Sequence, residues 1–224
     1  MRLPERRMRA LNRLFPGPLL VLLLLTLLLA AKPSRGQSQT AVLSQPDPRG
    51  IVPLVGRSGT LLQYGTGVVV GRDTIVTADH LLSQSVQVLL PDGTREGKPT
   101  CRTQIAGLAV VKAQLPPGTP QYRVTFREPS VGETVTIAGY PQRKWQVSTG
   151  RIMHLLESAT LSGRLIAAPM MVIDPALDYG ASGSPVLDGA GLVIGIAVAS
   201  NQEENYTIAL PAGSGLRSCR AFVK

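Results

Sequence analysis

Short apolar runs separated by turn residues follow one another from residue 50 towards the C-terminus. Gly, Pro, Asp and Asn stand between the runs, and few segments show a helical period. The runs are GTGVVVGRDTIVTADHLL (65–82), VQVLLPDGT (86–94), LAVVKAQL (108–115), ETVTIAGYP (133–141), RLIAAPMMVI (164–173), LVIGIAVAS (192–200) and NYTIALP (205–211). Short strands at such intervals predict an all-β barrel or sandwich. The only helical segments expected are a turn over Leu81–Gln84 and a C-terminal helix over Gly213–Phe222.

The N-terminus has a different pattern. Basic residues precede an apolar run of 13 residues, Leu19–Ala31, and small residues follow it. This pattern is typical of a secretory signal with cleavage after Gly36, because a membrane span needs ~20 residues. Retention as an anchor stays open, since Leu14–Ala31 approaches that length. We therefore expect residues 1–36 to form a signal peptide or N-terminal membrane anchor, 37–49 a linker, and 50–224 a domain outside the cytosol, either secreted or periplasmic.

The charge of the chain is concentrated in the same segment. The formal net charge is +9, and residues 1–36 hold seven Lys or Arg and one Glu, a net +6, which leaves +3 for the remainder. That remainder has no cluster of Lys or Arg, so nucleic acid is not an expected partner. Membrane contact is expected only through an uncleaved N-terminal segment. The sequence makes no prediction about oligomeric state.

The chain has two cysteines, Cys101 and Cys219. In an oxidising compartment they would form one disulfide that ties the C-terminal tail to the domain. The alternative is a pair of buried thiols that do not meet. The two histidines, His80 and His154, have no Cys or acidic neighbours at ligand spacing, so neither a metal site nor a cofactor is expected.

The stretch YGASGSPVLDG (179–189) has the composition of a tight turn that presents one hydroxyl, that of Ser182. Gly180 and Gly183 flank the serine, and glycine tolerates the positive φ of such a turn. Backbone N–H groups of such a turn can converge on a developing oxyanion. A nucleophilic serine also needs a base. His80, at the end of the apolar stretch IVTADH, is the candidate.

These segments, taken in order, resemble trypsin-like serine peptidases. The resemblance is to the exported bacterial kind that forms the protease core of HtrA/Deg proteins, here without a PDZ domain, and it covers about residues 50–211. It depends on the His80 segment, PDGT, LAVVK, VGETVTIAGYP, VSTGRI and the stretch from VIDPALDYGASGSP to GIAVAS. It implies a chymotrypsin-like fold of two six-stranded antiparallel Greek-key β-barrels with the active site between them.

The resemblance also implies roles for individual residues. His80 would be the general base, Ser182 the nucleophile, and the backbone N–H groups of Gly180 and Ser182 the oxyanion hole. The strand beside the substrate would contain Ala197, Val198, Ala199 and Ser200. The partner would be a peptide or protein substrate. Ala176 occupies the position that is acidic in trypsin, so a preference for basic side chains is not implied.

One member of the expected triad is missing. The family has an Asp immediately before the LAVVK segment, and this chain has Gly107 there. Asp79, Asp92 and Glu96 are poorly placed to substitute, and Ser200 is a weak candidate for a replacement acceptor. Loss of the acid costs about 10⁴ in turnover in the type case.

Two functions therefore remain open. One is a serine endopeptidase that works with a Ser–His dyad or with an unrecognised acid, and the retained His80 and Ser182 favour it. The other is an inactive pseudoprotease that serves as a peptide-binding or scaffold module, which Gly107 favours. A further segment, QRKWQ (142–146), is interpreted as a solvated hairpin with one packed aromatic.

Overall fold

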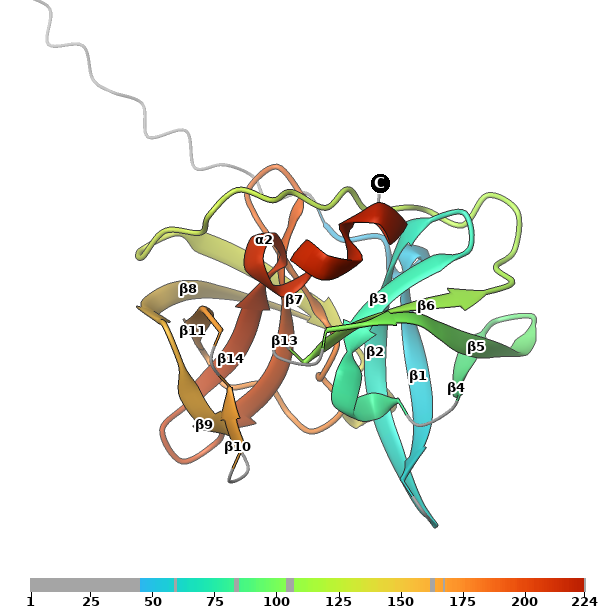
Figure 1. Cartoon of the computed structure of the whole chain (residues 1–224), viewed down its shortest axis with the longest axis horizontal. Helices are drawn as coiled ribbons and strands as arrows, with labels where there is room; N and C mark the ends of the chain where they lie inside the picture. Colours follow the sequence, from blue (N-terminus) through green and yellow to red (C-terminus); the bar gives the residue numbers. More distant parts are fainter. Residues whose placement is uncertain are drawn as a thin grey trace, which may run out of the picture. The chain divides into compact units, whose positions relative to one another are not determined.

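The computed structural model of this chain contains two closed antiparallel β-barrels (Figure 1). It describes residues 45–58, 60–82, 85–103, 107–161, 164–166 and 168–223. The first barrel contains β1 (Ile51–Ser58), β2 (Leu61–Gly71), β3 (Thr74–Ala78), β4 (Val86–Leu90), β5 (Gly93–Arg102) and β6 (Leu108–Ala113). Its strand order is β1-β2-β3-β6-β5-β4.

The second barrel is built in the same way. It contains β7 (Thr134–Gly139), β8 (Gln146–Leu156), β11 (Met170–Asp174), β12 (Pro185–Leu187), β13 (Val193–Asn201) and β14 (Tyr206–Pro211). The order is β11-β14-β13-β12-β7-β8, and a separate two-stranded sheet pairs β9 (Ala159–Leu161) with β10 (Arg164–Ile166). The fold is therefore the predicted chymotrypsin-like pair of six-stranded barrels.

Three groups of buried side chains account for this arrangement. One fills the first barrel around Val69, Ile75 and Val111, and one fills the second around Ile137 and Ile194. The third lies between the barrels and draws on both: it includes Ile51, Val68, Val76, Leu108, Val110, Met170, Ile196 and Leu210. Burial of this apolar surface holds the two barrels against each other.

The C-terminal tail returns to the first barrel. A short helix α2 (Ala212–Gly215) and a 3-10 helix (Arg217–Phe222) follow β14, close to the expected helix over Gly213–Phe222. A disulfide joins Cys219 of this tail to Cys101 of β5, with a Cα–Cα distance of 5.7 Å. Of the two alternatives for these cysteines, the structure therefore has the disulfide.

The expected signal or anchor (residues 1–36) and most of the expected linker lie outside the described residues. Within the described ranges, no helix has the length and hydropathy needed to cross a membrane.

Candidate active site

The loop that carries Ser182 has the tight geometry expected from its glycines. Gly180 and Gly183 both adopt positive φ, at 98° and 87°. At Gly183 a Cβ atom would lie 1.9 Å from the backbone oxygen of Thr66 and 2.4 Å from Thr77 Oγ1. Side chains cannot occupy such distances, so glycine is required here both for its conformation and for close packing.

Thr66 of β2 contributes two hydrogen bonds to the loop. Its backbone N–H donates to the Ser182 carbonyl at 2.8 Å. Its Oγ1 donates to the Gly180 carbonyl at 3.2 Å and accepts from the N–H of Tyr140 at 3.0 Å. Thr66 is fully buried, and a side-chain hydrogen bond is stronger in such an environment than in water. The first barrel thus positions a loop that belongs to the second.

Two N–H groups of this loop stay unengaged. The neighbouring amides are used: Ala181 N–H donates to Asp178 O at 3.2 Å and Gly183 N–H to Ala197 O at 2.7 Å. The N–H groups of Gly180 and Ser182 donate no hydrogen bond to any part of the chain that the structure describes. They are the two groups that the family resemblance implies as oxyanion donors, and an oxyanion needs such unoccupied donors.

The serine itself is half-buried and its hydroxyl points to β13. Ser182 Oγ donates to the Val198 carbonyl at 3.4 Å. Over the described ranges, no hydrogen bond joins Ser182 to His80. Catalytic hydrogen bonds are often long or absent in unliganded enzymes, so this geometry does not exclude a dyad.

His80 follows directly from β3, in a 3-10 helix over Asp79–Leu81. Thr77, three residues earlier, lies against Gly183 of the serine loop, so the fold brings the two candidate residues to the same region. His80 is exposed, but the surrounding protein still desolvates the ring and lowers its pKa, and the charge of Asp79 only partly opposes this. A lowered pKa keeps the imidazole neutral, as a base must be.

Asp79 is engaged elsewhere. Its Oδ1 accepts from Arg102 Nε at 2.5 Å, and Arg102 also donates to the backbone oxygens of Asp79 and Leu82. This ion pair gives a physical reason for the expectation that Asp79 does not orient His80.

Gly107, at the position where the family resemblance implies an acid, has few described neighbours. Gly107 has φ 69°, and its carbonyl accepts from the Asp79 N–H at 2.7 Å. A Cβ atom there would meet one atom of the described residues within 4 Å, Leu210 Cδ1 at 3.8 Å. Ser200 is exposed and has no side-chain hydrogen bond in the described part of the chain. The suggestion that Ser200 replaces the acid is therefore not supported.

The strand expected to lie beside a substrate has a free edge. β13 pairs with β14 as far as Asn201, but its pairing with β12 ends at Ile196. The backbone of Ala197 binds Gly183 and Ser184 of the serine loop. Beyond it, Val198, Ala199 and Ser200 have one side without a partner strand among the described residues, where an extended peptide can add.

The segment before the serine is held by polar contacts rather than by charge. The Ala176 N–H donates to Asn205 Oδ1 at 3.2 Å, and Gln202 Nε2 donates to the Leu177 carbonyl at 2.7 Å. Asp174 Oδ1 accepts from the Arg151 N–H at 2.7 Å, so this carboxylate binds the end of β11 to β8. Asp178 is exposed.

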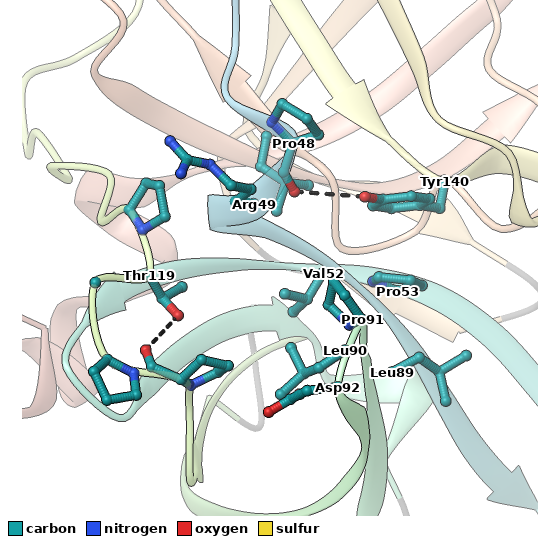
Figure 2. Close-up of a pocket in the computed structure, with 15 residues that line it drawn as sticks. Pro48, Arg49, Val52, Pro53, Leu89, Leu90, Pro91, Asp92, Thr119 and Tyr140 are labelled. Atoms are coloured by element: carbon teal, nitrogen blue, oxygen red, sulfur yellow. Dashed lines mark hydrogen bonds between the residues drawn. The ribbon is translucent and has the colours of Figure 1, made fainter.

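A groove of about 480 Å³ lies outside this set of residues (Figure 2). Six prolines and a tyrosine contribute to its wall: Pro48, Pro53, Pro91, Pro116, Pro117, Pro120 and Tyr140. Neither His80 nor Ser182 lines it. The groove is therefore separate from the candidate site, although Tyr140 contributes to both.

Sequence reasoning missed Thr66 and the turn over Tyr140–Arg143. Their roles depend on contacts with residues far away in the chain, such as Gly180. The only local indications were the GTG and GYP triplets around them, which the resemblance included without a role.

The family model of the trypsin-like peptidase domain matches residues 65–196, a range that includes His80, Gly107 and Ser182. The chain belongs to this family. No curated protein sequence gives a significant match to the chain.

The structure of this trypsin-like peptidase domain is similar to solved structures of proteases. The Rv3671c protease from M. tuberculosis in its active form has a TM-score of 0.69 and 22% identity, over 78% of this chain and 81% of that one. The HtrA-type protease AlgW with tripeptide has a TM-score of 0.66 and 20% identity, over 79% of this chain and 60% of that one. The serine endoprotease from Yersinia pestis has a TM-score of 0.60 and 22% identity, over 73% of this chain and 59% of that one. At these identities the likeness shows the fold.

Proposed function

We propose that this protein is a serine endopeptidase in which Ser182 is the nucleophile and His80 the general base. In the first step Ser182 Oγ attacks the substrate carbonyl while His80 takes its proton, and His80 then gives that proton to the leaving amine. The N–H groups of Gly180 and Ser182 stabilise the oxyanion. Without an acid at Gly107, turnover is slow.

One observation carries this proposal: the unengaged N–H pair of Gly180 and Ser182. A loop kept only for its fold has no reason to leave two amides without partners, because unpaired backbone groups are costly. The buried hydrogen bonds of Thr66 to this loop support the same function, since preorganised donors are the largest single contribution in acyl transfer.

The substrate is a peptide or protein that pairs with the free edge of β13. The compartment we propose is extracytoplasmic, because stable disulfides such as Cys101–Cys219 form in oxidising environments. Whether the N-terminal segment is cleaved or retained as an anchor is decided by sequencing the N-terminus of the mature protein.

A second function has its own support. Gly107 removes the group that holds the imidazole in the correct tautomer, and no described side chain replaces it. In this alternative the domain binds extended peptides at β13 without cleaving them.

Labelling by a fluorophosphonate probe distinguishes the two. We expect the full chain to be labelled slowly at Ser182, and Ser182→Ala to give no signal. His80→Ala should also remove the label, because an unactivated serine does not react. Peptide mapping of the labelled protein identifies the residue. An unlabelled parent under conditions that label an active serine protease would reject the dyad and favour the binding module.

The labelling rate should depend on pH in a specific way. Because desolvation lowers the pKa of His80, the neutral base is present at lower pH than for an ordinary histidine. We expect the rate to rise through a midpoint below ~6.5, the ordinary histidine value, and to level off by neutral pH. Rate measurements from about pH 4 to pH 8 test this. A midpoint above the ordinary value would mean that an unrecognised carboxylate acts on His80.

A further inference from the structure

The turn after β7 has an unusual backbone. Gln142 and Arg143 both adopt positive φ, at 50° and 64°, although neither is glycine or asparagine. Hydrogen bonds hold the turn: Gln142 N–H donates to Tyr179 O at 2.7 Å, and Arg143 N–H to Tyr140 O at 3.0 Å. Such conformations cost of order 1 kcal/mol each and are concentrated at functional sites. The turn is therefore a candidate functional element.

The conformation places the Arg143 guanidinium over the ring of Tyr64, 5.2 Å from its centroid. Arg143 is exposed and Tyr64 is half-buried. In the described part of the chain no carboxylate forms an ion pair with Arg143. A guanidinium that is stacked on a ring is oriented in advance, and its planar edge stays free to bind a carboxylate with two hydrogen bonds.

This pair lies beside the candidate nucleophile. Tyr64 is two residues before Thr66 on β2, so both side chains lie on one face of the strand, ~7 Å apart. Thr66 contacts Ser182, and the turn packs against the same loop: a Cβ at Gly180 would lie 3.1 Å from Tyr140 O and 3.3 Å from Gln142 N. Tyr64 and Arg143 therefore border the serine loop from the side of β2.

β2 and β13 contact different atoms of Ser182: Thr66 N–H binds its carbonyl, whereas its Oγ donates to Val198. Val198 of β13 accepts from Ser182 Oγ, so the part of a substrate before the scissile bond lies along the free edge of β13. The chain after the scissile bond leaves Ser182 in the other direction, over β2 and the turn. At ~3.4 Å per extended residue, its second or third residue reaches Tyr64.

We propose that Tyr64 and Arg143 form a subsite that selects Asp or Glu at the second or third position after the scissile bond. The inference rests on the proposed function only for the direction of the peptide. Since the ion pair is exposed, we expect a moderate preference, about fivefold over the uncharged amide, that decreases as salt increases.

The test uses full-length Ser182→Ala, which holds a peptide without cleaving it. The probes are fluorescein-labelled pools of randomised decapeptides, each with Glu, Gln or Lys fixed at one position, and the readout is the fluorescence anisotropy. We expect the Glu pool to bind about fivefold more tightly than the Gln pool. Arg143→Ala should remove this difference, and Arg143→Glu should reverse it in favour of the Lys pool.

Lys144 provides the matched control, because it is the next residue, equally exposed, and not stacked on a ring in the described structure. Lys144→Ala should keep the preference. Equal binding of the Glu and Gln pools, no binding of any pool, or loss of the preference in both alanine variants overturns the proposal.

Fluorophosphonate labelling distinguishes failure of the proposed subsite from failure of the proposed function. The probe reports on Ser182 alone and does not occupy the subsite, so labelling of the parent tests the proposed function independently of the peptide preference. Where the parent is labelled, sequencing of its cleavage products locates the acid relative to the cut. An acid found consistently before the cut contradicts the direction proposed for the peptide.

Discussion

Gly107→Asp is expected to increase the rate of fluorophosphonate labelling of Ser182 by about 10²–10⁴-fold. In the type case, loss of the acid alone costs about 10⁴ in turnover, because the carboxylate holds the imidazole in the correct tautomer and stabilises its protonated form. Restoring the carboxylate should recover most of this loss in rate if the rest of the site is intact. Labelling and peptide hydrolysis, measured side by side in parent and variant, give the result.

The described residues do not crowd a Cβ atom at this position. A Cβ at Gly107 makes only an ordinary contact with Leu210 Cδ1, at 3.8 Å. The positive φ of 69° disfavours most residues, but Asp tolerates this region better than most, at a cost of about 1 kcal/mol. The Gly107 carbonyl already binds the amide of Asp79, next to His80. The backbone that would carry the acid is thus retained where the acid itself is lost.

Gly107→Asn is the matched control, because it has the same size and the same tolerance of positive φ but no charge. It should label no faster than the parent. In Gly107→Asp the new carboxylate should raise the pKa of His80, so the midpoint of the pH profile moves upward. Equal rates for the Asp and Asn variants would show that the loop has lost catalytic geometry, and that the binding module is the better description.

Replacing both Cys101 and Cys219 by Ala is expected to lower the free energy of unfolding by about 4 kcal/mol. The bond closes a loop with a sequence separation of 118 residues, and cross-links over loops of this length restrict the unfolded chain most. It also fixes the tail, whose Leu216, Cys219 and Val223 pack into the cluster between the barrels. Urea unfolding of the parent and the double variant measures the difference.

A reductant supplies the control for this prediction. It should destabilise the parent by a similar amount and leave the double variant unchanged, because the variant has no bond to reduce. A change below about 1 kcal/mol in the double variant would mean that packing of the tail, and not the cross-link, holds it to the first barrel.

The fold was largely predictable because its strands are short, apolar and separated by turn residues. The apolar runs did not include β1, β5, β8, β9 and β12, and two of these strands show why. β1 contains Pro53 and Gly56, which weaken a strand prediction, yet it pairs with β2 along its whole length. β8 is mostly exposed or half-buried, so its sequence lacks a clear apolar alternation. β1 forms a hairpin with β2, and β8 pairs with β7 on one side and β11 on the other, so backbone pairing defines both strands where the side-chain pattern does not.

The candidate site was predictable only in part. His80, Ser182 and Gly107 lie in motifs whose order is preserved along the chain, and the family match covers all three. Thr66 and Arg143 could not be found in this way, because their importance arises from contacts across the barrel interface. The segment QRKWQ shows the limit well. Trp145 packs against Tyr140, with ring centroids 5.4 Å apart, as expected of one packed aromatic, but no local rule predicted the left-handed backbone beside it.

The dependence of the serine loop on Thr66 has a consequence for the order in which the protein matures. Synthesis completes the strands of the first barrel well before residues 179–184 leave the ribosome, and domains generally fold in that order. The loop receives its final hydrogen bonds only when the second barrel docks on the first. A nascent, truncated or nicked chain would therefore carry a chemically silent serine, and the proposed activity would begin only in the finished molecule.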